Sequence, residues 1–126
     1  MVVAGCATGR QPPGDTDWWL VELDGTPVAA SGQREPYLRL LSEGERLTGF
    51  TTCNNLFGRY ESRGGGRVRF VSLGSTRMAC VDPTLSRQEQ RFMAALQAVD
   101  RFAVVRDTLI LFEGRRPRAR FVADRR

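Results

Sequence analysis

The sequence contains no histidine among its 126 residues, and this absence removes the side chain most often used as a general base and as a metal ligand. It contains no lysine either, so all 19 basic residues are arginines, and with 14 acidic residues they give a net charge of +5. Proteins that contact nucleic-acid phosphates commonly use lysine as well as arginine. Because the arginines are also spread along the sequence, we expect a solvated basic surface rather than a polyanion site, and no nucleic-acid partner.

Long apolar segments and closely paired cysteines are also absent. The longest apolar runs, such as residues 109–112, have the length of a strand and fall far short of the ~20 residues that cross a bilayer. The three cysteines, Cys6, Cys53 and Cys80, lack the Cys-x-x-Cys spacing of a zinc site. We therefore expect one small domain that holds neither a metal nor a cofactor.

The N-terminal residues contain a candidate lipidation site. The segment Val-Ala-Gly-Cys at residues 3–6 resembles the lipobox of bacterial lipoproteins, in which a peptidase cuts before the cysteine and its thiol receives a diacylglycerol. The residues that follow are small, polar and rich in glycine and proline, as is typical of a flexible tether. The alternative is a chance cysteine in a cytosolic N-terminus. Lipidation of Cys6 would divide the chain into a signal remnant (1–5), a tether (6–16) and a folded domain (17–123).

Export bears on the other two cysteines as well. If Cys6 is acylated, Cys53 and Cys80 remain, and in an oxidising compartment such a pair favours a disulfide. The alternative is two buried free thiols that pack as small apolar side chains. Ala7, rather than aspartate, follows Cys6, which resembles the pattern of lipoproteins sorted to the outer membrane. We therefore expect a lipid anchor in the outer membrane and a domain that faces the periplasm.

The rest of the sequence predicts a mostly antiparallel β domain of the α+β class. Trp18–Leu23 alternates, with Trp19, Val21 and Leu23 expected on one face, and Asp24-Gly25 signals a turn after it. Further strands are expected at residues 37–41, 47–52, 59–61, 67–71, 102–105, 108–112 and 118–122.

One helix is expected, and its start is indicated by a capping box from Ser86 to Glu89. Four apolar residues then fall at helical spacing and form a single stripe: Phe92, Ala95, Leu96 and Val99. A lone helix with one apolar face needs a concave apolar partner. A curled sheet, or a cracked barrel, provides that surface.

Two short motifs, in this order before the helix, carry a resemblance to a known family. They are Cys53-Asn54, preceded by Leu47-Thr48-Gly49, and Thr76-Arg77-Met78-Ala79-Cys80. Further matches are Trp19-Leu20, Asp24-Gly25, Phe57-Gly58-Arg59-Tyr60, Glu89, Phe92, Leu96 and Leu109-Ile110-Leu111. Over about residues 18–122 the sequence resembles the META domain family, which includes the HslJ-like heat-shock lipoproteins. It departs from the commonest pattern at Thr52, where a glycine usually precedes Cys-Asn.

The resemblance implies an exported β-rich domain with one packed helix, similar in fold to the cracked barrel of a type III secretion pilot lipoprotein. Some members are connected with the heat-shock response and novobiocin tolerance, but the resemblance identifies no reaction. The motif residues also have structural interpretations. Asn54 could shape a turn, Thr76 could tie a loop, and Met78 could pack in the core.

These observations leave three classes of function. The first is a non-enzymatic binding or envelope-maintenance module, acting in stress or drug tolerance, with an envelope protein or an apolar small molecule as its partner. The second is an accessory, pilot-type lipoprotein for an outer-membrane component. The third is a hydrolase with paired carboxylates, for which the sequence offers an acidic cluster that we expect to be solvated: Asp15, Asp17, Glu22 and Asp24. We expect no enzyme, because the hydroxyl side chains have no histidine or lysine to activate them.

Binding is expected around the two motifs, on a patch that comprises Asn54, Arg59, Thr76 and Arg77. The alternative is that this patch is only a structural clasp. The type of partner depends on the interior. A cavity lined by Trp19, Phe50, Phe70 and Leu96 would favour a small apolar ligand, whereas a filled core with an exposed apolar patch would favour a protein.

Overall fold

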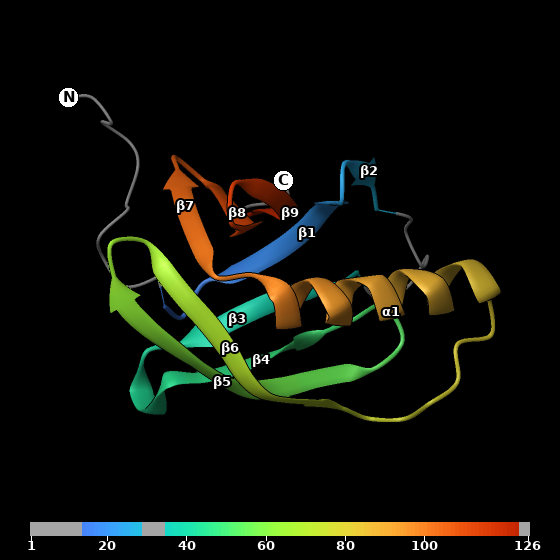
Figure 1. The fold of residues 1–126 in the computed structure, drawn as a ribbon. Helices are drawn as coiled ribbons and strands as arrows, with labels where there is room; N and C mark the ends of the chain where they lie inside the picture. Colours follow the sequence, from blue (N-terminus) through green and yellow to red (C-terminus); the bar gives the residue numbers. More distant parts are fainter. Residues whose placement is uncertain (1–13, 29–34, 124–126) are drawn as a thin grey trace.

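The protein is described here by a computed structural model that covers residues 14–28 and 35–123, and it consists of one curled antiparallel sheet and one long helix (Figure 1). The elements are β1 (Asp17–Leu23), β2 (Thr26–Pro27), β3 (Tyr37–Leu41), a 3-10 turn η1 (Glu43–Glu45), β4 (Arg46–Phe50), β5 (Asn55–Gly64), β6 (Arg67–Ser75), α1 (Pro83–Ala98), β7 (Arg101–Val105), β8 (Thr108–Glu113) and β9 (Arg116–Val122). This architecture confirms the α+β, mostly antiparallel fold expected from the sequence.

The sheet curls into a ring because its two ends meet. The strand order is β2-β1-β3-β4-β5-β6-β7-β8-β9, and β1 also pairs with β9. The ring is weakest between β6 and β7, whose register contains a single residue pair, Arg67 opposite Arg101. In Figure 1, α1 runs beside this seam, and it contacts β6 and β9. The helix therefore packs against the ring where the pairing of neighbouring strands is thinnest.

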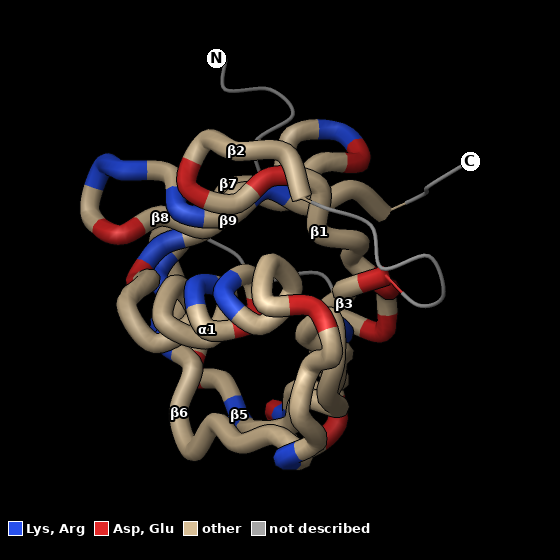
Figure 2. The backbone as a smooth tube through the Cα atoms, turned by 90° about the vertical axis from the view of Figure 1, so that its right-hand side faces the viewer, with Lys and Arg blue, Asp and Glu red and all other residues tan. Residues whose placement is uncertain are grey.

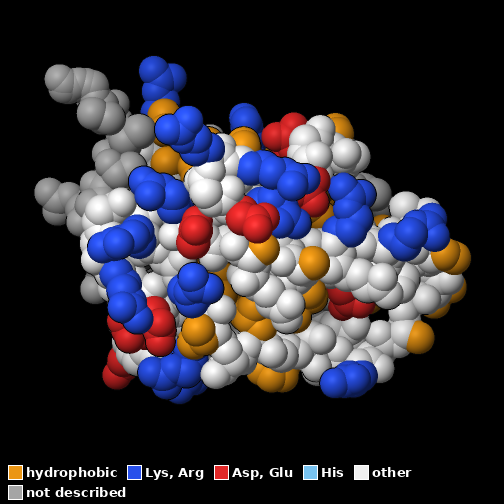
Figure 3. All heavy atoms as spheres, viewed as in Figure 1, with side chains coloured by type: hydrophobic (Ala, Val, Ile, Leu, Met, Phe, Trp, Pro, Cys, Tyr) orange, Lys and Arg blue, Asp and Glu red, His pale blue; other side chains and the backbone are white. Residues whose placement is uncertain are grey.

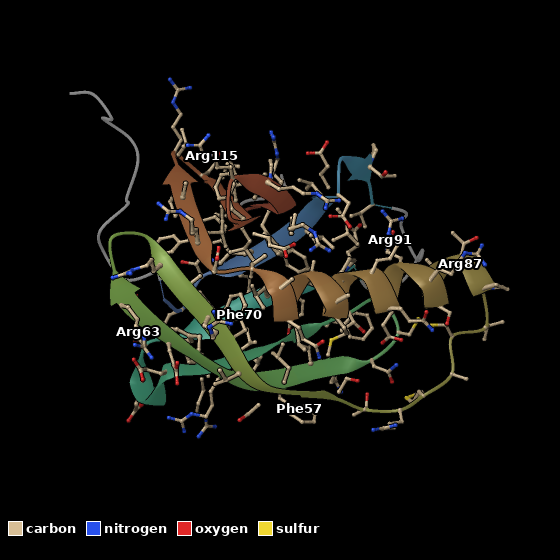
Figure 4. All side chains as sticks on the ribbon, in the orientation of Figure 1. Phe57, Arg63, Phe70, Arg87, Arg91 and Arg115 are labelled. Carbon is tan, nitrogen blue, oxygen red and sulfur yellow. A yellow bond between two sulfur atoms is a disulfide. The ribbon has the colours of Figure 1, made fainter. Side chains whose placement is uncertain are left out.

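The helix presents the predicted apolar stripe to the interior. Phe92, Ala95, Leu96 and the C-cap residue Val99 are fully buried, and Phe92 packs against Phe121 of β9. The sheet contributes residues from every long strand to the same core. Phe70 points inward and is buried, while Phe57, on the neighbouring strand, points away from the core (Figure 4).

Two local predictions are wrong. In β1 the buried residues are Trp18, Leu20 and Leu23, not Trp19, Val21 and Leu23. The β1–β9 register shifts between Leu20 and Glu22, and this bulge returns Leu23 to the face of Trp18 and Leu20. Trp19 instead packs against the ring of Tyr37 at a centroid distance of 5.2 Å.

The second error concerns the start of the helix. The helix begins at Pro83, and its N-cap is Asp82, whose carboxylate accepts a hydrogen bond from the Thr84 amide at 2.8 Å. The N–H group at the first helical position has no acceptor within the helix, so its absence in proline costs no hydrogen bond there. Asp82-Pro83 is therefore the effective start signal. Ser86 therefore lies inside the helix, and Glu89 is free to contact another element.

The acidic cluster near the N-terminus forms ion pairs with arginines while most of it stays exposed. Asp24, at the turn after β1, bonds the Arg118 guanidinium at 2.6 Å, and this hydrogen bond raises the pKa of Arg118. Asp17 pairs with Arg39 at 2.7 Å. Figure 2 shows acidic and basic segments side by side where the β1–β2 turn meets β9. Asp24 ties the turn after β1 to β9, whereas Asp15 is exposed and the Asp17 side chain keeps 41% of its surface exposed. Most of the cluster is therefore solvated, as expected, and Asp24 is the exception.

The helix α1 is the longest in the described part of the chain, and none of the helices there is long and apolar enough to cross a membrane.

Candidate binding site at a disulfide-linked clasp

A disulfide joins the two motifs that the sequence singles out. Cys53, in the loop between β4 and β5, is bonded to Cys80, in the segment that leads from β6 to α1, and their Cα atoms lie 5.6 Å apart. We call the loop 51–54, the segment 76–80 and Glu89 of α1 the clasp. The clasp links the sheet to the start of the helix.

Asn54 is the centre of the clasp, and only 4% of its surface is exposed. Its Nδ2 donates to the Met78 carbonyl at 2.9 Å and to Glu89 Oε2 at 2.7 Å. Its Oδ1 accepts from the Thr76 hydroxyl at 2.9 Å and from the Met78 amide at 2.7 Å. Both donors and both acceptor sites of the amide are therefore used, as a buried polar group requires.

Glu89 connects this network to the helix. Its Oε2 also accepts a hydrogen bond from the Thr51 hydroxyl, and its Oε1 lies 3.7 Å from Cys80 Sγ. The Thr51 hydroxyl in turn accepts from the backbone N–H of Asn54 at 3.2 Å. A carboxylate held by an amide and a hydroxyl fixes the orientation of α1 relative to the loop, because hydrogen bonds to a charged group are stronger than neutral ones.

The structure brings together three of the four residues predicted for the binding patch. Asn54 and Thr76 meet in the network, and Arg77 lies on its exposed rim. Arg59 is separate, because it lies on β5 opposite Arg46 and Val71 and has an exposed side chain. All hydrogen-bonding positions of the Asn54 side-chain amide are occupied within the clasp. The accessible part of the predicted patch is therefore Arg77 together with the side chains around it.

A shallow hollow of about 330 Å³ lies beside the clasp. Its lining is mixed: Leu73 and Met93 supply apolar surface, Arg77 a positive charge and Glu89 a negative one. Met78 stands at its edge with 70% of its surface exposed, which corrects the expectation of a core position. Val81, three residues later, is fully exposed.

One group of residues in the described part of the chain has the composition of a metal site. The ligand atoms of Cys53, Cys80 and Glu89 lie within 4.8 Å of one another. The two sulfurs are bonded to each other, so neither is the thiolate that a metal would need. The chemistry that remains available at the clasp is hydrogen bonding, one guanidinium and exposed apolar contact.

Glu89 and Thr51 are the network members that sequence reasoning missed. A signal was present, because Glu89 stands three residues before Phe92 and seven before Leu96, on the stripe that the helix buries. A carboxylate on a buried stripe needs a partner. Thr51 carries no such signal, because its role depends on the path of the loop.

The backbone conformation at Thr52 explains why the family usually has a glycine at this position. The φ of Thr52 is +129°, in the region that glycine adopts readily and β-branched residues do not, and its hydroxyl accepts from Gln88 Nε2 at 3.2 Å. Thr52→Gly and Thr52→Ala both delete that hydroxyl, but only glycine relieves the backbone strain. We expect Thr52→Gly to be more stable than Thr52→Ala by about 1–2 kcal/mol, measured by urea unfolding. Equal stabilities would show that the loop is not strained here.

Comparison with known proteins agrees with this geometry. The META domain family model matches residues 11–125. An NMR structure of a protein from Burkholderia xenovorans is similar, with a TM-score of 0.70 and 30% identity over 90% of this chain and 84% of that one. A second NMR structure has a TM-score of 0.68 at 22% identity, covering 86% and 90% of the two chains.

A crystal structure of a DUF4847 family protein from Bacteroides vulgatus shares the fold, with a TM-score of 0.62 at 13% identity, covering 90% of this chain and 95% of that chain. A comparison with curated proteins gives no significant match. The match of the family model over most of the chain, together with the 30% identity to the Burkholderia protein, shows that this chain belongs to the META domain family.

Proposed function

We propose that this chain is a non-enzymatic binding module of the bacterial cell envelope, and that its partner is a protein that docks on the loop of residues 76–81. The observation that carries the proposal is the contrast within this loop. Its backbone is pinned by the Asn54 amide and by the disulfide at Cys80, while the side chains of Arg77, Met78 and Val81 face solvent. A rigid backbone that presents apolar side chains loses little conformational entropy when it binds.

The interior supports a protein partner over a small apolar ligand. Phe70 and Leu96 belong to the core and Phe50 is buried. None of these three residues lines any of the hollows described. Trp19, the fourth residue expected to line a cavity, packs on Tyr37 instead. A filled core combined with exposed apolar side chains is typical of a protein-binding surface.

The charge on the loop indicates the chemistry of the partner. Arg77 has no ion pair within the described residues, and it stands beside the exposed thioether of Met78. We infer a partner segment that offers an apolar pocket flanked by a carboxylate. An accessory role for an outer-membrane component would use this same surface, and the identity of the captured protein distinguishes it from a general role in envelope maintenance or stress tolerance.

Single substitutions on the loop test the docking surface. We expect Met78→Ser and Val81→Ser each to weaken binding about tenfold or more, because buried anchor side chains dominate such interfaces. The partner is first identified by crosslinking from detergent-solubilised envelopes and then purified for Kd measurement. Val105→Ser is the matched control, since Val105 is an exposed valine on the β7–β8 hairpin. Unchanged Kd values for both loop variants, with melting temperatures also unchanged, would overturn the proposed surface.

Membrane attachment is proposed to occur through a lipid on Cys6, which lies outside the described residues. A mature lipoprotein carries enough acyl chain for stable anchoring, whereas one chain gives only marginal attachment. We expect a palmitate analogue to label the protein expressed with an intact signal, and Cys6→Ser to abolish the label and release the protein from the outer-membrane fraction. Labelling that persists in Cys6→Ser would contradict this assignment.

A further inference from the structure

Four arginines that are scattered in the sequence converge in the folded chain. Arg63, Arg67, Arg69 and Arg101 line a hollow of about 410 Å³ at the β5–β6 hairpin, together with Val68 and Asp100. We call it the arginine hollow. Figure 3 shows basic side chains gathered over this hairpin, and Figure 4 labels Arg63 at its tip.

Positive charge in the hollow is poorly compensated. Arg67, Arg69 and Arg101 form no ion pair with any described residue, and Arg63 approaches Glu61 only at 3.5 Å with both side chains exposed. Asp100 is the single carboxylate in the lining, and its Oδ1 already accepts from the Gly114 amide at 3.0 Å. Within the lining, four arginines therefore share one partly occupied carboxylate; Glu61, which lies opposite Arg69 in the β5–β6 register and 3.5 Å from Arg63, stands outside it.

The arrangement of Arg67 and Arg101 makes an anion favourable at a particular point. These residues are directly opposite each other, and they are the single pair that joins β6 to β7. Like charges in directly opposed positions of a sheet destabilise the pairing. An anion between the two guanidinium groups would replace this repulsion by attraction and would bridge the thinnest seam of the ring.

We propose that the arginine hollow binds a phosphate group. Guanidinium groups offer planar pairs of N–H donors that match phosphate oxygens, and several of them converge here on a concave surface. A tetrahedral dianion or diester can bridge two or more guanidinium groups at once. Chloride lacks the pairs of oxygens that match the planar guanidinium donors, so we expect it to bind more weakly.

The position of the hollow favours the headgroup of an anionic lipid as the source of the phosphate. The described chain begins at the same end of the ring, where the Asp15 amide donates to the Leu40 carbonyl at 2.6 Å and Tyr60 of β5 donates to the Leu41 carbonyl at 3.1 Å. The eight residues from 7 to 14 span at most about 29 Å when fully extended. This choice of source rests on the proposed anchor at Cys6, whereas phosphate binding itself does not.

The test uses the full-length chain with Cys6→Ser, so that no acyl group contributes. In the first arm, inorganic phosphate is compared with sodium chloride at equal ionic strength by thermal unfolding and by NMR chemical shifts. In the second, flotation compares vesicles of phosphatidylglycerol with vesicles of phosphatidylcholine. We expect phosphate to stabilise the protein, and phosphatidylglycerol to retain it. Stabilisation by phosphate without vesicle binding would support the site and assign it to a soluble phosphate compound.

Matched variants separate a built site from net charge. Arg67→Gln and Arg101→Gln should each weaken phosphate binding about tenfold, because each substitution removes one charge-assisted hydrogen bond to the phosphate. Arg87→Gln, on the exposed face of α1, removes the same charge elsewhere and should have little effect (Figure 4). No response to phosphate or to anionic vesicles, or equal losses in all three variants, would overturn the proposal. Partner capture by the 76–81 loop is measured in the same variants, so a failure here is distinguishable from a failure of the proposed function.

Discussion

Loss of the Cys53–Cys80 disulfide is expected to lower the free energy of unfolding by about 3–4 kcal/mol. The bond closes a loop of sequence separation 27 that contains the whole β5–β6 hairpin. Without it, the unfolded chain gains conformational freedom, and in the folded chain the segment before α1 is held only by hydrogen bonds. For a small domain a loss of this size is a large part of its total stability.

The measurement is urea unfolding of the oxidised protein, of the protein with a reductant, and of the Cys53→Ala/Cys80→Ala variant. The variant provides the control, because a reductant should change the midpoint of the wild-type protein and leave that of the variant unchanged. Intact mass after alkylation of denatured, non-reduced protein verifies that the bond is present. Identical unfolding midpoints for oxidised and reduced wild-type protein would show that the clasp does not depend on the covalent bond.

The parts of the fold that could be predicted are those in which local pattern and burial agree. Residues 67–71 alternate polar and apolar side chains, and in β6 Val68 and Phe70 are buried while Arg67 and Arg69 are exposed. The stripe on α1 was readable for the same reason, since one apolar face at helical spacing has few other ways to be buried. In both cases the period of the sequence equals the period of the element.

Prediction failed where the inward side of a strand lacks apolar residues, or where a bulge resets that period. β5 runs from Asn55 to Gly64, although the sequence indicated only residues 59–61. Its more and less exposed residues alternate throughout, but Gly58 and Ser62 on the inward side are not apolar, so the pattern was too weak to read. In β6 the period is reset, because its pairing with β5 shifts where Gly74 lies opposite Phe57 and Val71 lies opposite Arg59. A bulge changes which side of the strand a residue faces, and no pattern with a period of two survives it. The bulge between Leu20 and Glu22 causes the error in β1.

The candidate site was predictable in position but not in mechanism. The two cysteine motifs indicated which loops meet, and the disulfide joins them. The contact between Asn54 and Glu89 crosses 35 residues of sequence and depends on where the helix begins, which was itself misjudged. The arginine hollow was hidden more completely, because Arg67 and Arg101 become neighbours only through the β6–β7 pairing, and scattered arginines give no local signal.

Asn54 distinguishes a structural clasp from a binding residue. Because all four hydrogen-bonding positions of its amide are used inside the protein, Asn54→Ala leaves the Met78 amide and carbonyl without this partner and weakens the support of the Glu89 carboxylate. Each buried polar group left unpaired costs about 1–3 kcal/mol. We expect Asn54→Ala to lose about 3–4 kcal/mol of stability in total, measured by urea unfolding.

The neighbouring residue supplies a matched control. Asn55 is exposed, and it contributes to the clasp through its backbone, so Asn55→Ala should change the stability by no more than about 0.5 kcal/mol. A double-mutant cycle of Asn54→Ala with Glu89→Ala should give a coupling of about 1–3 kcal/mol, because each single substitution removes the same hydrogen bond between the two residues. A small effect of Asn54→Ala combined with additive losses would mean that Asn54 is not structural, and its amide would then return as a candidate for direct contact with the partner. Arg77→Ala, which removes none of the hydrogen bonds described in the network, should leave stability unchanged and weaken only the binding of the partner.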